Sequence, residues 1–219
     1  MATGPGSTAA QEREGALAAS SELASACRAC DLWERATQTV FGAGPAGASL
    51  MLIGEQPGDQ EDRTGQPFVG PAGRVLDEAL EAAGIARDRV YVTNAVKHFK
   101  WAPRGKRRIH QRPNRAEVLA CRHWLDVEMS VLDRDAVLVA LGATAGQALF
   151  GSTFRVGTAR GKDLTFEDRP LVATLHPSAV LRAESDERAR LFTDLVQDLQ
   201  RARSIVRRSQ AGPAAPPRD

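Results

Sequence analysis

The sequence predicts an α/β fold, a single three-layer α/β/α domain with a central, mostly parallel sheet of four strands. Short, continuously apolar runs alternate along the chain with longer segments of helical periodicity, which is typical of buried parallel strands joined by helices. The chain has 219 residues, of which 42% are hydrophobic and 26% charged. That size and composition suit one globular domain with a substantial core.

Apolar runs and the polar residues that stop them place the individual elements. Strands are expected at residues 49–54, 89–97, 136–141 and 171–175. Helices are expected at residues 11–35, 72–83, 114–132, 143–150 and 186–202. Asn114 and Glu117 are spaced for a capping box, and residues 153–169 are interpreted as a hairpin or an irregular insertion. The domain is expected to span residues 16–203, between flexible tails at residues 1–15 and 204–219.

The amino-terminal residues lack the cationic start and apolar run of a signal peptide. No apolar stretch approaches the ~20 residues that cross a bilayer. We therefore expect a cytoplasmic protein without a membrane partner. Nothing in the sequence predicts assembly, so we also expect a monomer.

Three of the expected strands end in residues that can do chemistry. Glu55 and Gln56 follow the first, Asn94 ends the second and His176 follows the fourth. Ligands of open parallel sheets bind beyond the carboxyl ends of the strands, so these side chains are expected to meet. Each of these residues also allows a structural interpretation. Gln56 could orient a loop, Asn94 could cap a turn, and His176 could form a hydrogen bond to the backbone.

The segment at residues 101–115 gathers cations around one imidazole. It contains Lys106-Arg107-Arg108-Ile109-His110, with Pro103 and Gly105 before it and Pro113 after it, and this composition is expected to resist both helix and strand. A charge run is often only a solvated surface. Here we expect the cations to bind nucleic-acid phosphates and His110 to carry the reactive nitrogen.

The cysteine pattern favours a metal site. Three cysteines are an odd number, which disfavours a disulfide framework in a reducing compartment. Cys27 and Cys30 have the spacing of a metal or redox pair, and Cys121 adds a third soft ligand. His98, just before the basic segment, is a further candidate ligand.

Four ordered segments resemble the uracil-DNA glycosylase superfamily. They are Gly54-Glu55-Gln56-Pro57-Gly58, Gly65-Gln66-Pro67-Phe68-Val69-Gly70-Pro71-Ala72-Gly73, Thr93-Asn94-Ala95-Val96-Lys97 and His176-Pro177-Ser178. Within the superfamily the chain is similar to the iron–sulfur families. It looks most like the X-type enzymes, which an inserted Lys-Arg-Arg-Ile-His loop sets apart. The resemblance covers nearly the whole chain between the expected tails.

The resemblance implies how bound DNA is read. Phe68 stacks on a flipped base and Asn94 pairs with the edge that separates uracil from cytosine. His176 donates a hydrogen bond to the uracil oxygen that becomes negative as the N-glycosidic bond breaks. The other implied substrate-binding residues are Gly54, Lys106, Arg107, Arg108, Ser178 and Arg182, of which the last two hold phosphates.

The resemblance also implies the reaction, excision of uracil from DNA, expected to be single-stranded, with free uracil as product. Glu55 and Gln56 are assigned to catalysis, since a carboxylate or amide in this motif positions water. His110 is expected to trap C1′ of the sugar first and leave a stable covalent bond, with the three neighbouring cations keeping its ring unprotonated. One alternative is an enzyme that turns over while His110 only assists; another is a non-catalytic nucleic-acid-binding module.

A [4Fe–4S] cluster is the cofactor that the resemblance implies. Its ligands would be Cys27, Cys30, Cys121 and His98, the last at a position where the family pattern has a cysteine. Zinc suits the same ligands and is the alternative. The expected task of the cluster is structural.

Overall fold

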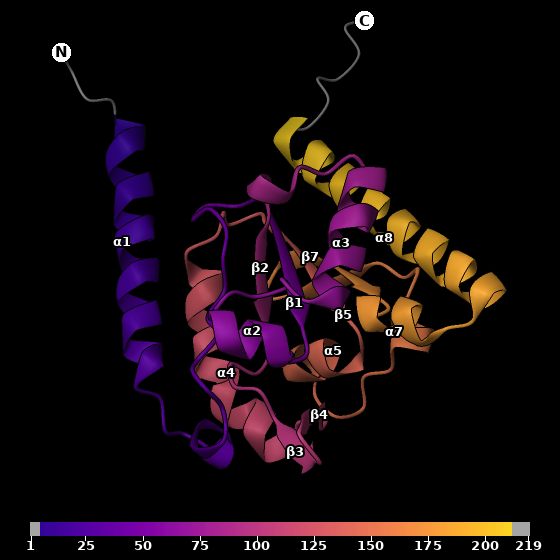
Figure 1. Ribbon diagram of the computed structural model, residues 1–219. Helices are drawn as coiled ribbons and strands as arrows, with labels where there is room; N and C mark the ends of the chain where they lie inside the picture. The colour runs from indigo at the N-terminus through magenta and orange to yellow at the C-terminus, as the bar shows by residue number, and fades with distance from the viewer. Residues whose placement is uncertain (1–4, 212–219) are drawn as a thin grey trace, which may run out of the picture.

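A five-stranded sheet lies at the centre of the computed structural model, which describes residues 5–211 (Figure 1). The strands are β1 (Leu50–Gly54), β2 (Tyr91–Asn94), β5 (Val137–Leu141), β6 (Leu164–Phe166) and β7 (Arg169–Thr174). Their order is β2-β1-β5-β7-β6, with β6 antiparallel to β7 and the other pairs parallel. The four parallel strands are the predicted ones. Strand β6 lies within residues 153–169, where a hairpin or an irregular insertion was expected, and it forms a hairpin with β7.

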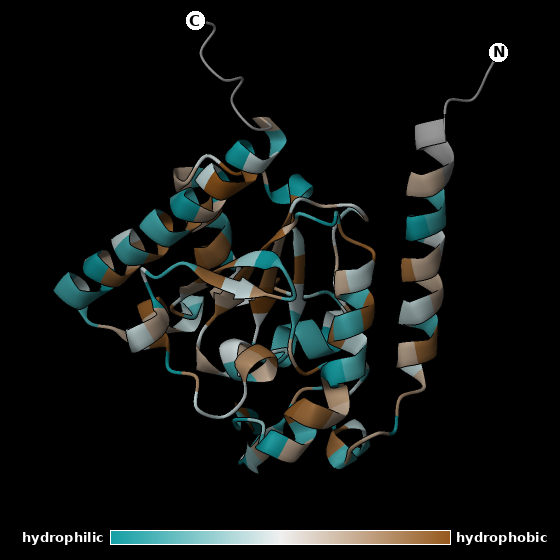
Figure 2. Ribbon diagram, turned by 180° about the vertical axis from the view of Figure 1, so that it is seen from behind, coloured by the Kyte–Doolittle hydropathy of each residue, from teal (hydrophilic) through white to brown (hydrophobic). Residues whose placement is uncertain are grey.

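Alternate residues of β1 face two separate hydrophobic clusters. Met51 and Ile53 pack in a cluster with α4 (Arg115–Ser130) and α5 (Ala143–Phe150). On the opposite face lies a second cluster, formed by β1, α3 (Pro71–Ala82) and α8 (Ser185–Ala211). Along α8, hydrophilic and hydrophobic residues alternate, as an amphipathic covering helix requires (Figure 2). Helices thus cover both faces, and the predicted three-layer α/β fold is confirmed.

Helix α1 (Pro5–Ser25) packs on the outer side of α4 (Figure 1). Residues 5–15, which were expected to form a flexible tail, are helical, and residues 1–4 lie outside the described part. Arg13 reaches Asp133 at 3.0 Å and holds this helix to the domain. The helix expected at residues 11–35 ends at Ser25, and a short 3-10 helix, η1 (Asp31–Glu34), follows.

The carboxyl-terminal helix is longer than predicted. It continues to Ala211, so the tail expected from residue 204 is helical up to that residue, and residues 212–219 lie outside the described range. Two contacts hold its last turns: Arg203 Nη1 donates to the carbonyl of Ala83 at 3.1 Å, and Gln210 Nε2 donates to Ser49 Oγ at 3.2 Å.

The basic segment forms a β-hairpin, although its composition was expected to resist strands. Strand β3 (Trp101–Arg104) pairs antiparallel with β4 (Arg107–His110), which sets Trp101 opposite His110. The two-residue turn has φ of 60° at Gly105, and glycine at the first turn position is what a type II′ hairpin prefers. Pro103 is tolerated because this two-stranded sheet consists of edges.

Four short elements complete the description. They are α2 (Asp59–Thr64), η2 (Arg87–Arg89), α6 (Val156–Ala159) and α7 (Pro177–Arg182). None of the helices between residues 5 and 211 combines the length and apolar character that crossing a membrane requires.

Candidate functional site

The carboxyl ends of the parallel strands bring the predicted residues to one edge of the sheet. Gly54 pairs in register with Asn94. A Cβ atom on Gly54 would lie 2.4 Å from Asn94 Oδ1 and 2.6 Å from the Phe68 ring. Only glycine fits here, because the amide and the aromatic ring close over its backbone. Gly54, Phe68 and Asn94 therefore lie together at this edge.

The Phe68 backbone is in the left-handed region, with φ of 57°, which bulky residues rarely adopt. Its ring centroid lies 6.3 Å from that of His176. Glu61 shapes the segment before and after it, since its carboxylate accepts from the Gly58 amide at 3.1 Å and from the Gly70 amide at 2.9 Å. Such strain persists where the surroundings dictate it, and here it sets the position of an aromatic ring.

The hydrogen bonds of His176 fix the position of its ring proton. The Ser178 backbone N–H donates to Nδ1 of His176 at 3.1 Å, so Nδ1 bears a lone pair and the proton of the neutral ring is on Nε2. Arg182 Nη1 donates to Ser178 Oγ at 2.9 Å, and this oxygen lies 2.8 Å from the same Nδ1. Burial, then the charges of Arg182 and His110, lower the pKa of His176 to about 4. Near pH 7 the ring is neutral with one N–H to donate.

His110 lies beside Glu55. Its Nε2 atom is 3.4 Å from Oε1 of the glutamate, and 49% of its side chain is exposed. Burial, and after it the charge of Arg182, lower the pKa of His110, while Glu55 acts in the opposite direction. This effect was expected from the three cations before His110, whereas its main cause is burial and the cation that contributes is Arg182 of α7.

The Arg108 side chain points into the domain and not toward solvent. Its guanidinium pairs with Asp59 and lies 2.6 Å from Asp62, and it stacks over the rings of Phe99 and Trp101 at 5.4 and 5.5 Å. Arg108 was expected to bind phosphate, but its guanidinium instead links β4 to α2 through these two carboxylates.

Two other cations of the hairpin remain accessible. Lys106 and Arg107 are exposed at and beside its turn, where the sequence expected phosphate-binding residues.

Gln56 is buried between the two ends of the hairpin segment. Its Nε2 donates to the carbonyls of Lys100 and Gln111 at 3.2 and 3.0 Å, and its Oε1 accepts from the Lys100 amide at 3.2 Å. Because both amide hydrogens are used, these contacts favour the loop-orienting interpretation of Gln56 over the catalytic one.

Sequence reasoning missed four residues that support the site. Asp59 and Asp62 hold Arg108, while Thr144 and Arg112 contact Glu55. The acidic residues that follow Gly58 could have indicated the Arg108 contact, because a basic segment needs acidic partners. Thr144 gave no signal, because only the fold brings the start of α5 next to the end of β1.

The candidate metal ligands are only partly assembled. The Cys30 and Cys121 thiols are neighbours, and the interaction with Cys121 lowers the pKa of Cys30 to about 6. Cys27 Sγ accepts from Trp124 Nε1 at 3.3 Å. His98 Nε2 is 2.9 Å from Thr39 Oγ1, while its Nδ1 is buried without a partner.

In the described part of the chain, no three His, Cys, Asp or Glu side chains converge closely enough to hold a metal ion. Two adjacent thiols and an unpartnered buried imidazole nitrogen nevertheless fit a thiolate-rich metal group chemically.

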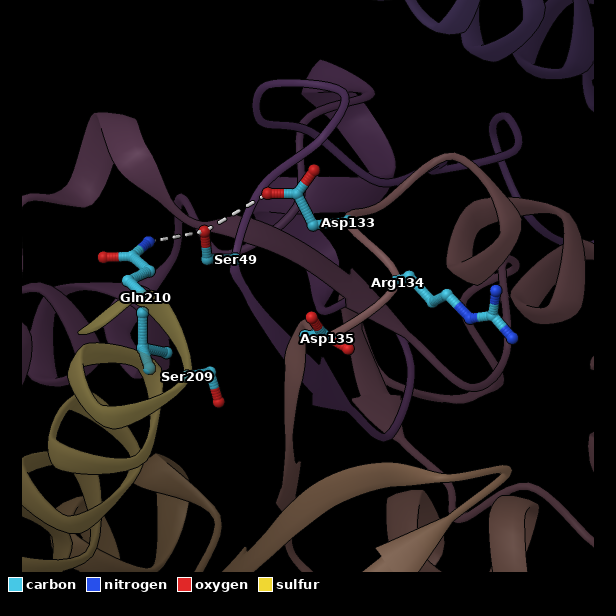
Figure 3. A pocket seen from close by; sticks show the side chains of 7 residues that line it. Ser49, Asp133, Arg134, Asp135, Ser209 and Gln210 are labelled. Atoms are coloured by element: carbon cyan, nitrogen blue, oxygen red, sulfur yellow. Dashed lines mark hydrogen bonds between the residues drawn. The ribbon is translucent and has the colours of Figure 1, made fainter. Parts of the chain in front are cut away.

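A hollow at the opposite edge of the sheet is separate from this site (Figure 3). It lies where β1 and β5 begin, and its lining residues are Ser49, Asp133, Arg134, Asp135, Val206, Ser209 and Gln210. None of the predicted site residues is among them.

Comparison with known proteins gives a consistent match. The family model described as the uracil DNA glycosylase superfamily matches residues 41–200. The chain is 35% identical to the Type-4 uracil-DNA glycosylase of Thermotoga maritima over 198 residues, which cover 90% of this chain and 97% of the relative. It is 35% identical to the Type-4 enzyme of Archaeoglobus fulgidus, with 71% and 78% covered. It is also 35% identical to the Type-5 uracil-DNA glycosylase of Thermus thermophilus, with 50% and 53% covered.

Proposed function

We propose that this chain, which belongs to the uracil DNA glycosylase superfamily, cleaves the N-glycosidic bond of uracil in DNA. The observation that carries the proposal is the neutral His176, whose Nδ1 accepts from the Ser178 amide so that Nε2 bears the proton, and whose ring centroid lies 6.3 Å from that of Phe68. The Type-4 and Type-5 relatives, named uracil-DNA glycosylases, support it.

In the proposed reaction each of four side chains has one role. A flipped uracil stacks on Phe68 and pairs with the amide of Asn94. The bonding electrons of C1′–N1 leave with uracil, and the His176 Nε2–H donates to the oxygen that gains the charge. The Glu55 carboxylate faces the cationic sugar and takes a proton from the water that adds to C1′.

The DNA contacts are proposed on the exposed cations around this edge. Lys106 and Arg107 lie on the hairpin and Arg182 on α7, and all three are exposed. Their spread suits a phosphate backbone that enters beside the hairpin and leaves along α7. We propose single-stranded DNA as the preferred form, because a flipped base then costs less unstacking.

A [4Fe–4S] cluster is proposed on Cys27, Cys30, Cys121 and His98. Three thiolates and one imidazole are a complete ligand set, and the pairing of Cys30 with Cys121 and the unpartnered His98 nitrogen support it. Bound there, the cluster would supply a structural link between the segment after α1, the start of the hairpin segment and α4.

A base-release assay tests the main proposal. The protein is incubated with two single-stranded oligonucleotides that differ only in one uracil or cytosine, and abasic sites are then cleaved with alkali. Cleavage at uracil alone is the expected result. Intact uracil DNA after prolonged incubation with iron-loaded protein would leave only the nucleic-acid-binding alternative.

A second candidate function is favoured by the position of His110. Its Nε2 lies 3.4 Å from Glu55, and in this proposal both groups face C1′ of the bound sugar. In this reaction the Nε2 lone pair forms a bond to C1′, the C1′–N1 electrons leave with uracil, and uracil takes a proton from solvent. The enzyme would then remain bound to its product.

On the sequence alone trapping was preferred, but the relatives support turnover more strongly, since they are named Type-4 uracil-DNA glycosylases. A denaturing gel decides between the two. A DNA band shifted by the mass of the protein indicates trapping, and an abasic product without a shift indicates turnover.

A further inference from the structure

The hydroxyl of Thr144 makes an unusual contact for a helical threonine. Thr144 is the second residue of α5, is 2% exposed, and donates its hydroxyl proton to Oε2 of Glu55 across to the end of β1. The hydroxyls of Thr158 and Thr193 instead donate to carbonyls three and four residues before them. Thr144 therefore links two elements and does not cap its own helix.

Arg112 fixes the direction of this hydrogen bond. Its Nε donates to Thr144 Oγ1 at 3.3 Å and lies 3.8 Å from Oε2 of Glu55, while its Nη2 donates to Gln147 Oε1 at 3.1 Å. Because a guanidinium can only donate, the threonine oxygen accepts from it and must turn its own proton to the glutamate.

The two oxygens of the glutamate consequently have different partners. Oε2 is occupied by the hydroxyl and lies near the arginine, whereas Oε1 faces Nε2 of His110 at 3.4 Å. Without the hydroxyl bond, the carboxylate could rotate about its last torsion, which is broad and roughly two-fold.

The turn that carries Thr144 is itself fixed against the site. Gly142 precedes α5 with φ of 89°, and a Cβ atom there would lie 2.9 Å from Cβ of His176. The same turn thus touches the residue proposed to donate to uracil and the residue that orients the glutamate.

We propose that Thr144 is a positioning residue, which holds Glu55 so that one carboxylate oxygen alone faces the sugar and His110. This inference rests on the proposed uracil excision and names what sets the geometry of its carboxylate. Thr144 itself does not reach substrate, and it acts through Glu55.

The test is a double-mutant cycle measured as single-turnover uracil release. Hydrogen bonds to charged groups contribute ~1.5–3 kcal/mol, so Thr144→Val is expected to slow release about tenfold to a hundredfold, with DNA affinity unchanged. Thr144→Ser, which keeps the hydroxyl, should restore the rate to within about threefold. In a Glu55→Gln background, Thr144→Val should slow release no further, because its partner is already altered.

The matched control is Thr193→Val, which removes an exposed helical hydroxyl and should leave the rate unchanged. An unchanged rate in Thr144→Val, or an equal loss in the Glu55→Gln background, overturns the role of Thr144 while leaving the proposed function intact. No uracil release by the unaltered protein instead overturns the proposed function, and with it the reaction that Thr144 serves.

Discussion

Nε2 of His110 lies 3.4 Å from Oε1 of Glu55. The histidine ends β4 and the glutamate follows β1, so the hairpin brings an imidazole to the carboxylate at the sheet edge. Two nucleophiles would therefore compete for the same sugar carbon: a water molecule held by the Glu55 carboxylate, and Nε2 of His110. If water adds first, the enzyme turns over; if His110 adds first, the enzyme stays bound to the DNA.

Replacement of His110 separates excision from trapping. In His110→Ala, uracil release is expected to continue because Phe68, Asn94 and His176 are untouched, while any shifted band on a denaturing gel disappears. His123→Ala is the control, since His123 is exposed on α4 and bonds only to the Ala120 carbonyl. A shifted band that survives in His110→Ala would assign the bond to DNA to another residue.

Loss of a donor to the departing base should slow the chemical step. We expect His176→Ala and Asn94→Ala each to reduce the single-turnover rate of uracil release by ~10²–10³-fold, the range for one transition-state hydrogen bond. Rate constants at saturating protein measure this effect without a contribution from binding. If either variant released uracil at the original rate, that residue would have no part in the transition state.

Arg108 and Arg107 are neighbours with opposite expected roles. Arg108→Ala leaves the buried Asp62 without its cation, so the hairpin should lose order and the yield of any His110 adduct should fall. Arg107→Ala should instead weaken DNA binding uniformly and reduce the slope of log K against log salt by ~1. Equal effects of the two variants on binding and on adduct yield would contradict this division.

Regular elements were well predicted because burial and periodicity determine them. Helix α5 was expected at residues 143–150 and is found at Ala143–Phe150. The Asn114 capping box is also present, with the Glu117 amide donating to Asn114 Oδ1 at 2.9 Å. Both features depend on local patterns that a single sequence contains.

The errors concern residues whose role depends on a distant partner. The sequence cannot show that the cation at position 108 meets Asp59 and Asp62, nor that Gln56 bridges Lys100 and Gln111. It also contains no local sign that Thr144 meets Glu55. Long-range contacts determine the roles of these residues. The charge pattern alone assigned Arg108 to phosphate binding, because it does not show the acidic partners.

The half-buried His176 makes the stability of the protein depend on pH. The pKa of His176 is about 4 in the folded protein, against an ordinary value of 6.5. Between those values the unfolded chain binds more protons, so the free energy of unfolding should rise as pH increases from about 4 to 6.5. His176→Gln should flatten that rise, as urea unfolding at several pH values would measure. A pH dependence as steep as that of the unaltered protein would contradict the burial of a neutral ring.

The proposed cluster predicts a difference between two substitutions of one ligand. His98→Cys should retain iron and acid-labile sulfide, because it supplies a fourth thiolate, while His98→Ala should lower both and the visible colour. Elemental analysis of purified protein measures the outcome. Stoichiometric zinc without iron in the unaltered protein would assign the site to zinc instead.

The most direct test of the account is the number of uracil molecules released per protein molecule, measured by mass spectrometry with DNA in excess. We expect at least one equivalent of uracil, and no cytosine from a matched strand. Release that stops at one equivalent would identify trapping by His110, and continued release would identify turnover. No free uracil from iron-loaded protein would contradict the central claim that this sheet edge cleaves the glycosidic bond.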